Sequence, residues 1–272
     1  MNIDYSFHSH TFRCNHASKD IEDYVIKAIE YGYKQYGVSD HVFLPGVQNP
    51  GTRGDYSLLD DYINEYHRVK NKYSKEIKMY LGFECEYSEC FLDYYRYLLK
   101  ERGFDYLICG QHMGFNSDYQ AYGYFDGSIE GLIHYKNDLI KAMKCGLFMY
   151  IAHPDLFFVA ATEYTPIHKD IIQDIINAAI KYDAVLELNI HGLFRNKDRH
   201  GYHYIDYPTE YFWKEVGKTN IKVVCGGDFH SPDEIGNMDN LKKIEAIIKN
   251  CNLNIININD VYNDYQKRIK SL

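Results

Sequence analysis

The stretch FHSHTFRCNH, residues 7–16, places His8, His10 and His16 directly after a short apolar run at 3–7. Side chains alternate along a strand, so the imidazoles of His8 and His10 point to the same side, which suits a two-point grip on a metal ion. The pair alone is weak support for a metal site, because most lone histidines are hydrogen-bonded core residues. Whether these histidines bind a metal ion therefore depends on which other ligand-type residues the chain brings next to them.

Short apolar runs alternate along the chain with helical periodicities. The continuous apolar character of the runs is typical of parallel strands that are covered on both faces. The clearest helical stripe runs from Ile167 to Ile180, with Thr165 as N-cap and Pro166 in the first turn. The predicted strands are 3–7, 35–40, 79–84, 105–110, 147–152, 184–189 and 221–227, and the predicted helices are 21–29, 62–73, 89–101, 128–144, 165–180, 209–217 and 240–250.

The ends of the predicted strands choose between two parallel-sheet architectures. An open doubly wound sheet places its ligands at one switch-point crevice, whereas a closed barrel gathers every strand end around one mouth. Ligand-type residues follow six of the seven predicted strands, which favours an α/β barrel with its active site at the C-terminal ends of the strands. The predicted metal ligands are His8, His10, His16, His41, Glu84, His112, His153, Asp228 and His230.

This mixture of nitrogen and oxygen ligands suits zinc, iron or manganese, and the sequence does not choose among them. Nine ligands are more than one ion needs, and three divalent ions sharing a bridging carboxylate would use them all. The remaining strand end supplies Glu187, Asn189 and His191, which rank lower as ligands and are assigned to substrate binding. The histidines within or beside helices are expected to be surface or packing residues: His67, His134 and His168.

Composition limits the remaining possibilities. The chain has 272 residues, 46% of them hydrophobic, and we expect one domain over residues 1–272. A formal net charge of −8 argues against nucleic acid as a partner, and no apolar run is long enough to span a membrane. The seven cysteines form no CxxC pair, which indicates a reducing, cytoplasmic location. The oligomeric state cannot be read from the sequence.

The motifs HSH, SDH, GFE, GQH, AHP and GGDFH occur in this order and resemble those of the polymerase-and-histidinol-phosphatase (PHP) superfamily. Within it, the opening FHSHTFRCNHA and the segments SDHVFLP and GFECEY are most similar to the monofunctional bacterial histidinol-phosphatases. The resemblance covers nearly the whole chain and fills every motif position. It implies a distorted (β/α)7 barrel and a metal-dependent phosphomonoesterase that hydrolyses L-histidinol phosphate, a small-molecule substrate, in histidine biosynthesis.

The resemblance also implies a trinuclear centre in which Glu84 bridges two ions. A hydroxide between these two ions would attack phosphorus, and Asp228 or His230 would relay the leaving-group proton. Glu84, Asp228 and His230 are therefore the predicted catalytic residues. The implied ligand sets are His8, His10, Glu84 and Asp228 for one ion, Glu84, His112 and His153 for the second, and His16, His41 and His230 for the third.

A phosphate group also needs a fixed cation, and Arg195 is the predicted one because guanidinium grips phosphate with two parallel hydrogen bonds. The segments 192–208 and 45–56 are predicted to be loops that cover the substrate. Four other basic residues near the motifs are weaker candidates for this role, and each taken singly is expected to be an ordinary surface charge: Arg13, Arg53, Lys197 and Arg199.

Other functions stay open at this point. Within the superfamily, the substrate could be another small phosphoester, such as a nucleoside bisphosphate, or protein phosphotyrosine. Amidohydrolase barrels also open with HxH, but they usually carry a lysine on strand four, where this chain has His112. A metal-supported scaffold without activity is a third class, which the complete ligand set disfavours.

Overall fold

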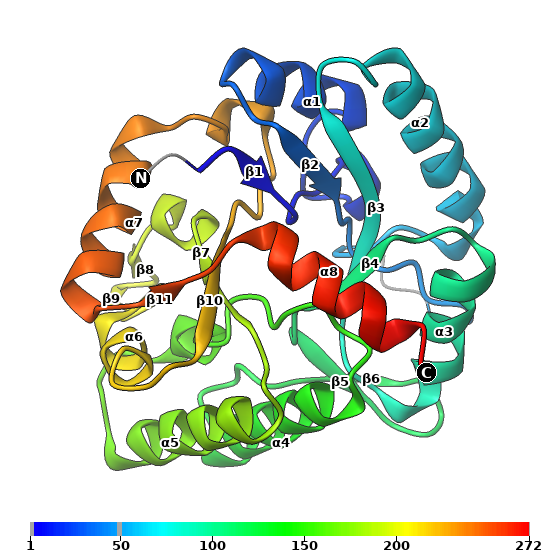
Figure 1. Cartoon of the computed structure of the whole chain (residues 1–272). Coiled ribbons are helices and arrows are strands. Elements are labelled where there is room, and N and C mark those ends of the chain that lie inside the picture. The colour runs from blue at the N-terminus through cyan, green and yellow to red at the C-terminus, as the bar shows by residue number, and fades with distance from the viewer. Residues whose placement is uncertain (1–2, 48–50, 272) are drawn as a thin grey trace.

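Six parallel strands form most of a ring that helices surround (Figure 1). The computed structural model describes residues 3–47 and 51–271. The predicted strand positions are confirmed, although several strands are shorter than predicted. The strands of the ring are β1 (Tyr5–Ser6), β2 (Gln35–Val38), β3 (Lys78–Cys85), β4 (Tyr106–Cys109), β7 (Leu186–Asn189) and β10 (Lys222–Gly226).

Single bridging residues close this ring. The order β1-β2-β3-β4 continues through Ile151, which bridges in parallel to Cys109 on β4 and to Leu186 on β7. The ring then passes to β10 and returns to β1 through a parallel bridge between Ser9 and Phe229. The predicted strand 147–152 is therefore present as a short link, which gives the barrel its distorted outline.

Helices cover the outside of the ring, and their apolar faces form the larger hydrophobic core against the strands. The predicted cap of α5 is confirmed, with Thr165 as N-cap and Pro166 at the first helical position. The surrounding helices are α1 (Ile21–Glu30), α2 (Leu59–Lys72), α3 (Leu92–Glu101), α4 (Ile129–Cys145), α5 (Pro166–Lys181), α6 (Glu210–Val216) and α7 (Met238–Cys251).

A helix that was not predicted from the sequence, α8 (Ile258–Ile269), closes the N-terminal end of the barrel (Figure 1). Its Ile258, Val261 and Tyr265 pack against residues inside the ring, such as Phe7 and Tyr106, and form a second, smaller core. The short strand β11 (Asn254–Ile255) pairs in parallel with β10 just before this helix. The open end of the barrel is consequently the C-terminal mouth.

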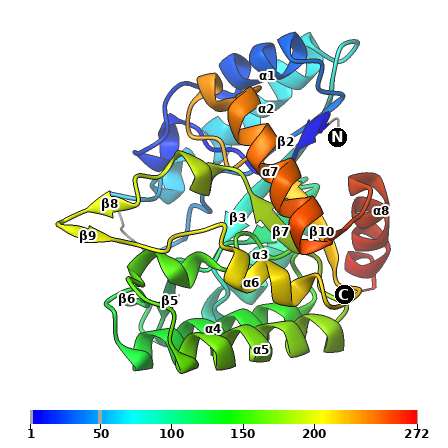
Figure 2. The same ribbon diagram turned by 90° about the vertical axis from the view of Figure 1, so that its left-hand side faces the viewer.

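Two antiparallel hairpins, β5 (Met113–Phe115) with β6 (Ala121–Gly123) and β8 (Asp198–Arg199) with β9 (Tyr202–His203), were also not predicted. Figure 2 shows the β8–β9 hairpin extending away from the barrel. It lies within the predicted covering segment 192–208. The other predicted covering segment, 45–56, contains residues 48–50, which lie outside the described residues. Within the part of the chain that the structure describes, no helix combines the length and apolarity needed to cross a bilayer.

Candidate metal centre

The nine predicted ligands meet at the C-terminal mouth of the barrel. Glu84 lies at the centre, with Oε1 2.8 Å from His153 Nε2 and 3.3 Å from His8 Nε2, and Oε2 3.0 Å from His41 Nδ1. Asp228 Oδ1 lies 2.9 Å from His10 Nε2. Further ligands surround this cluster: His112 Nε2 lies 3.5 Å from Glu84 Oε1, and the rings of His16 and His230 lie 4.9 Å apart.

Several of these imidazoles are held from behind through Nδ1. His8 Nδ1 lies 2.8 Å from Glu187 Oε1, and His112 Nδ1 lies 2.9 Å from Glu86 Oε1. A carboxylate in this position fixes the ring and its tautomer, and leaves Nε2 with a lone pair for a metal ion. Backbone carbonyls hold the Nδ1 atoms of His16 and His230 in the same way, from Cys14 at 3.0 Å and Asp228 at 2.9 Å.

Electrostatics keep the central carboxylate ionised. Burial raises the pKa of Glu84, but the imidazoles that surround it, including His8 and the hydrogen-bonded His153, together hold that pKa well below its usual value. Burial and the nearby His153 and Arg53 lower the pKa of His112 to about 3, so this imidazole is neutral, the form that binds metal. The neighbouring carboxylates instead raise the pKa of His8 well above its usual value and that of His10 to about 9. Metal coordination requires charged carboxylates and neutral imidazoles, so ions that bind here would displace the protons of His8 and His10.

Unpartnered buried atoms show that the centre fits divalent ions. His8 Nε2, His10 Nε2, His41 Nδ1 and Glu84 Oε2 are buried without a hydrogen-bond partner. Such atoms are costly in a protein unless another group, such as an ion, satisfies them. Groups with mutually close ligand atoms include His8, His10 and Asp228; His8, Glu84 and His153; and His10, His41 and His230. How the nine ligands divide among ions stays a prediction.

Three acidic or thiol side chains beside the ligands were missed or left undecided. Asp40 Oδ1 lies 3.5 Å from His10 Nδ1, and Glu86 supports His112. Cys14, which the sequence left undecided, is buried and can form a ligand group with His10 and Asp40. Alternation could have found Glu86, because it stands two residues after Glu84 at the end of the same strand.

Glu187 and Asn189 lie behind the ligands. Both are fully buried, and Glu187 Oε2 accepts hydrogen bonds from His153 N at 3.2 Å and from Asn189 Nδ2 at 2.9 Å. Asn189 Nδ2 also donates to Asp228 Oδ2 at 3.2 Å. These contacts favour a role in orienting the ligands over direct contact with a substrate.

Glycines make room for the two acidic side chains at the mouth. A Cβ atom at Gly110 would overlap the Glu84 carboxylate, and one at Gly226 would overlap the Glu187 carboxylate. His153 and Asp228 have positive φ values of 31° and 51°, a conformation that non-glycine residues rarely adopt. The close packing and the unusual backbone both lie at the mouth, where a functional site would hold them.

A pocket of about 320 Å³ opens above the ligands. Arg195 lies in its wall, as predicted, and its Nε donates to Asp206 Oδ1 at 2.8 Å. The prediction that Arg53 is a surface charge is wrong: its side chain is buried and pairs with Glu86, because an ion pair makes burial tolerable. Other residues of the wall are His16, His41, Thr52, His112, Met113, Leu156, His191, Tyr207, Asp228 and His230.

The other three basic residues do not line this pocket. Arg13 is also buried, contrary to prediction, and its guanidinium pairs with Asp20 at 2.5 Å and with Asp61 at 2.7 Å. Arg199 Nη1 donates to Asp206 Oδ2 at 2.7 Å. Lys197 Nζ donates to the carbonyl of Ile205 at 2.9 Å. Arg195 and Arg53 are thus the arginines that the structure places at the pocket.

Comparisons with known proteins agree with this geometry. The PHP domain family matches residues 6–191. A probable histidinol-phosphatase of Schizosaccharomyces pombe is 22% identical, with 85% of this chain and 82% of that protein covered. The histidinol-phosphatase of Bacillus subtilis is 23% identical, covering 90% of this chain and 98% of that protein. The crystal structure of histidinol phosphate phosphatase from Lactococcus lactis, complexed with zinc, L-histidinol and phosphate, superposes with a TM-score of 0.67 at 17% identity, covering 93% and 95% of the two chains.

Proposed function

The chain belongs to the PHP domain family, and on that premise we propose that it is a metal-dependent phosphomonoesterase that hydrolyses L-histidinol phosphate to L-histidinol and phosphate. The observation that carries the proposal is the convergence of the nine predicted metal ligands beneath a pocket that Arg53 and Arg195 line. The relatives named as histidinol-phosphatases, which match along most of their length, support the choice of substrate.

The residues around the pocket would have different roles in hydrolysis. Divalent ions held by the nine ligands would lower the pKa of a water molecule and neutralise charge on the phosphoryl oxygens. We assign the bridging position to Glu84, whose two oxygens face different histidines. Arg195 and Arg53 would bind the phosphoryl oxygens, because they are the fixed cations of the pocket wall. The number and identity of the ions, three of zinc, manganese or iron, stay part of the proposal.

The leaving alkoxide must receive a proton. We propose that Asp228 or His230 relays this proton, since both residues line the pocket. His191, which is not among the predicted ligands, lines the pocket beside them, with its ring 4.5 Å from that of His230. Leu156 and Tyr207 would pack against the organic half of the substrate, because both line the pocket. The assignments of one domain and of a cytoplasmic location also stay predictions.

A panel of phosphoesters tests the substrate. The metal-loaded protein is assayed with L-histidinol phosphate, adenosine 3′,5′-bisphosphate, a phosphotyrosine peptide and p-nitrophenyl phosphate. We expect kcat/KM for L-histidinol phosphate to exceed that for each other ester by at least about 100-fold, about 2.7 kcal/mol of transition-state stabilisation. A higher kcat/KM for the bisphosphate or the peptide would show that the substrate is a different phosphoester, although the reaction class would stand. If the protein turned over none of these esters, the proposed phosphatase activity would be refuted.

A further inference from the structure

Asp206 is a fully buried carboxylate between two arginines of the predicted covering segment 192–208. Its Oδ1 accepts a hydrogen bond from Arg195 Nε at 2.8 Å, and its Oδ2 accepts one from Arg199 Nη1 at 2.7 Å. Oδ1 also accepts a hydrogen bond from Tyr207 N at 3.2 Å. A buried carboxylate is unfavourable unless donors or cations satisfy it, and these three groups do so. Asp206 thus links the start of the segment to its end.

The hydrogen bond to Asp206 uses only Nε of the Arg195 guanidinium. Within residues 3–47 and 51–271, Nη1 and Nη2 of Arg195 form no hydrogen bond. The side chain is 34% exposed, lies in the wall of the pocket above the predicted ligands, and has its guanidinium carbon 5.7 Å from the centre of the Tyr207 ring. Paired guanidinium nitrogens bind two phosphate oxygens in parallel. Asp206 therefore holds Arg195 by one edge and leaves two nitrogens free for a phosphoryl group.

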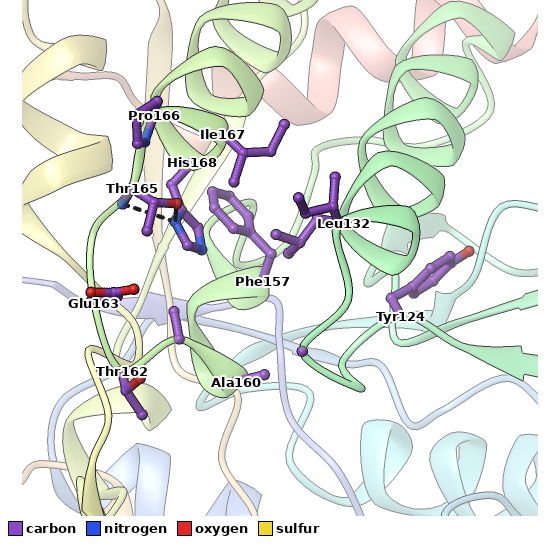
Figure 3. A pocket seen from close by; sticks show the side chains of 13 residues that line it. Tyr124, Leu132, Phe157, Ala160, Thr162, Glu163, Thr165, Pro166, Ile167 and His168 are labelled. Atoms are coloured by element: carbon purple, nitrogen blue, oxygen red, sulfur yellow. Dashed lines mark hydrogen bonds between the residues drawn. The ribbon is translucent and has the colours of Figure 1, made fainter.

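The short helix η4 (Leu156–Ala160) holds Asp206 and Arg199 in place. The carbonyl of Phe158 accepts a hydrogen bond from Asp206 N at 3.2 Å, and that of Val159 accepts one from Arg199 Nη2 at 2.5 Å. The first residue of η4 also lines the pocket above the predicted ligands. Figure 3 shows η4 at the edge of a separate cavity of about 480 Å³. Arg195 is therefore connected through Asp206 to a helix that forms part of the pocket wall.

The backbone at Asp206 has an uncommon conformation. Its φ of 57° lies in the left-handed region, where asparagine and aspartate occur more often than other non-glycine residues. Backbone of this kind persists where the surrounding structure fixes it, and it is concentrated at functional sites. The conformation therefore agrees with a functional role for this residue.

We propose that Asp206 is a positioning residue, which holds the Arg195 guanidinium in the orientation that binds a phosphoryl group. Arg199 fixes the same carboxylate to η4 and takes no part in binding the phosphoryl group. A side chain that is already oriented before the ligand arrives loses less conformational entropy on binding, so the ligand binds more tightly. The inference rests on the proposed function only in taking the phosphoryl group of a phosphomonoester as the ligand.

The sign of the effect separates positioning from a simple charge effect. A carboxylate near an anion-binding site repels the anion, so if only its charge mattered, Asp206→Ala would strengthen phosphate binding. If the carboxylate orients Arg195, the same change weakens phosphate binding, because the guanidinium is no longer held at Nε.

Calorimetric titration of the metal-loaded protein with inorganic phosphate measures this sign. We expect Asp206→Ala and Arg195→Ala each to weaken phosphate binding by at least about tenfold, the effect of losing a charge-assisted hydrogen bond to phosphate. The double variant should bind phosphate within about twofold of Arg195→Ala alone, because the two residues act as one unit.

Arg199→Ala is the matched control, because it removes the other arginine bound to the same carboxylate. It should change phosphate affinity by less than about threefold. Elemental analysis should show as many bound ions per chain in Asp206→Ala as in the unmodified protein. The reason is that, within the described part of the chain, Asp206 forms no hydrogen bond or ion pair with a predicted metal ligand.

Arg195→Lys tests the same idea with Asp206 unchanged, so the test stands even if Asp206→Ala does not fold. Lysine keeps the positive charge but has a single nitrogen, which cannot pair with Asp206 and also offer two free nitrogens to phosphate. We expect its phosphate affinity to fall by at least about fivefold.

Unchanged or tighter phosphate binding by Asp206→Ala, additive losses in the double variant, or full phosphate affinity in Arg195→Lys would overturn the positioning role. Equal losses in Arg199→Ala and Asp206→Ala, or fewer bound ions in Asp206→Ala, would also overturn it. Phosphate binding is measured without turnover. A protein that shows the expected losses but hydrolyses no ester would therefore refute the proposed function and still support the role of Asp206.

Discussion

The two ends of the barrel differ in how they satisfy polar groups. At the C-terminal mouth, His8 Nε2, His41 Nδ1 and Glu84 Oε2 are buried without a hydrogen-bond partner. At the closed end, Tyr106 OH lies 2.9 Å from the carbonyl of Phe7 and 3.0 Å from that of Val38, inside an aromatic core. One end is organised for binding, and the other is organised for stability, which is the division usual in barrel enzymes.

Because the two ends differ in this way, a substitution at one end should affect a different property from a substitution at the other. A change at the mouth removes an interaction with ions or substrate, so activity should fall more than stability. A change beneath α8 removes an interaction that exists only in the folded chain, so stability should fall while turnover per folded molecule stays constant. Measuring both activity and stability for variants at each end tests this division.

The largest effect is expected at the centre of the mouth. Glu84→Ala removes the carboxylate that faces His8, His41 and His153, so the bridged centre cannot form. We expect kcat to fall by at least about 10³-fold, because metal-assisted charge stabilisation supplies several kcal/mol. Elemental analysis should show fewer bound ions per chain. The exposed Glu101 provides the control Glu101→Ala, and near-normal turnover of Glu84→Ala would rule out the bridged centre.

The predicted covering segment 192–208 offers a matched pair of arginines. Arg195 and Arg199 both donate to Asp206, but of these two only Arg195 lines the pocket above the predicted ligands. We expect Arg195→Ala to lower kcat/KM for L-histidinol phosphate by about 10- to 100-fold, the effect of losing a charge-assisted bond to phosphate. Arg199→Ala should change it by less than about threefold. Equal losses in steady-state assays of the two variants would mean that the arginines act only by holding the loop.

The sequence alone was sufficient to predict the features that depend on residues close together in the chain. The apolar runs located the strands, and the Thr165–Pro166 cap located the start of α5. The nine predicted ligands were chosen because they follow strand ends, and the structure places them together at the mouth, although their binding of metal stays a prediction. The closing helix α8 was missed, although Ile258, Val261 and Tyr265 have helical spacing. These three apolar residues lie in a polar segment, so they are a weak signal for a buried helix. Their role becomes evident only from the structure, in which they cover the N-terminal end of the barrel.

Side-chain contacts between segments that are far apart in the chain could not be predicted from the sequence. The burial of Arg53 depends on Glu86, 33 positions later in the chain, and the contact of Glu187 with His8 joins residues that lie 179 positions apart. Residue type and spacing do not encode such contacts between distant segments. For the same reason, Glu187 and Asn189 were assigned to the substrate when the structure places them behind the ligands.

At the closed end, Tyr265 should matter for stability alone. Its hydroxyl lies 3.2 Å from Leu107 N, which donates to it, and donates to the carbonyl of Leu147 at 2.9 Å. Tyr265→Phe leaves both backbone groups buried without a partner, so we expect the free energy of unfolding to fall by about 1–3 kcal/mol. Denaturant unfolding measures this loss, and kcat should not change. Tyr262→Phe on the same helix is the control, because its hydroxyl has no hydrogen bond within the described chain.

The smallest effect is expected on the outer surface, where neither end of the barrel is involved. Glu22 on α1 pairs with Lys72 and with Arg68 of α2, at 2.5 Å in each case. Hydrogen bonds from Lys72, Arg68 and Tyr73 lower the pKa of Glu22 to about 2. A carboxyl whose pKa is lowered in the folded state stabilises the fold above its unfolded pKa of about 4.5 and loses that contribution as the pH falls towards 2.

Glu22→Gln should therefore lower the melting temperature slightly at pH 6 to 7, and the difference from the unmodified protein should shrink between about pH 4.5 and 2. Other carboxyl groups titrate equally in both proteins, so the difference isolates Glu22. Because the pair is near the surface, 1 M sodium chloride should also reduce the difference. A difference that grows on acidification, or a loss of turnover in this variant, would mean that the α1–α2 surface is coupled to the mouth and would remove the separation between the regions.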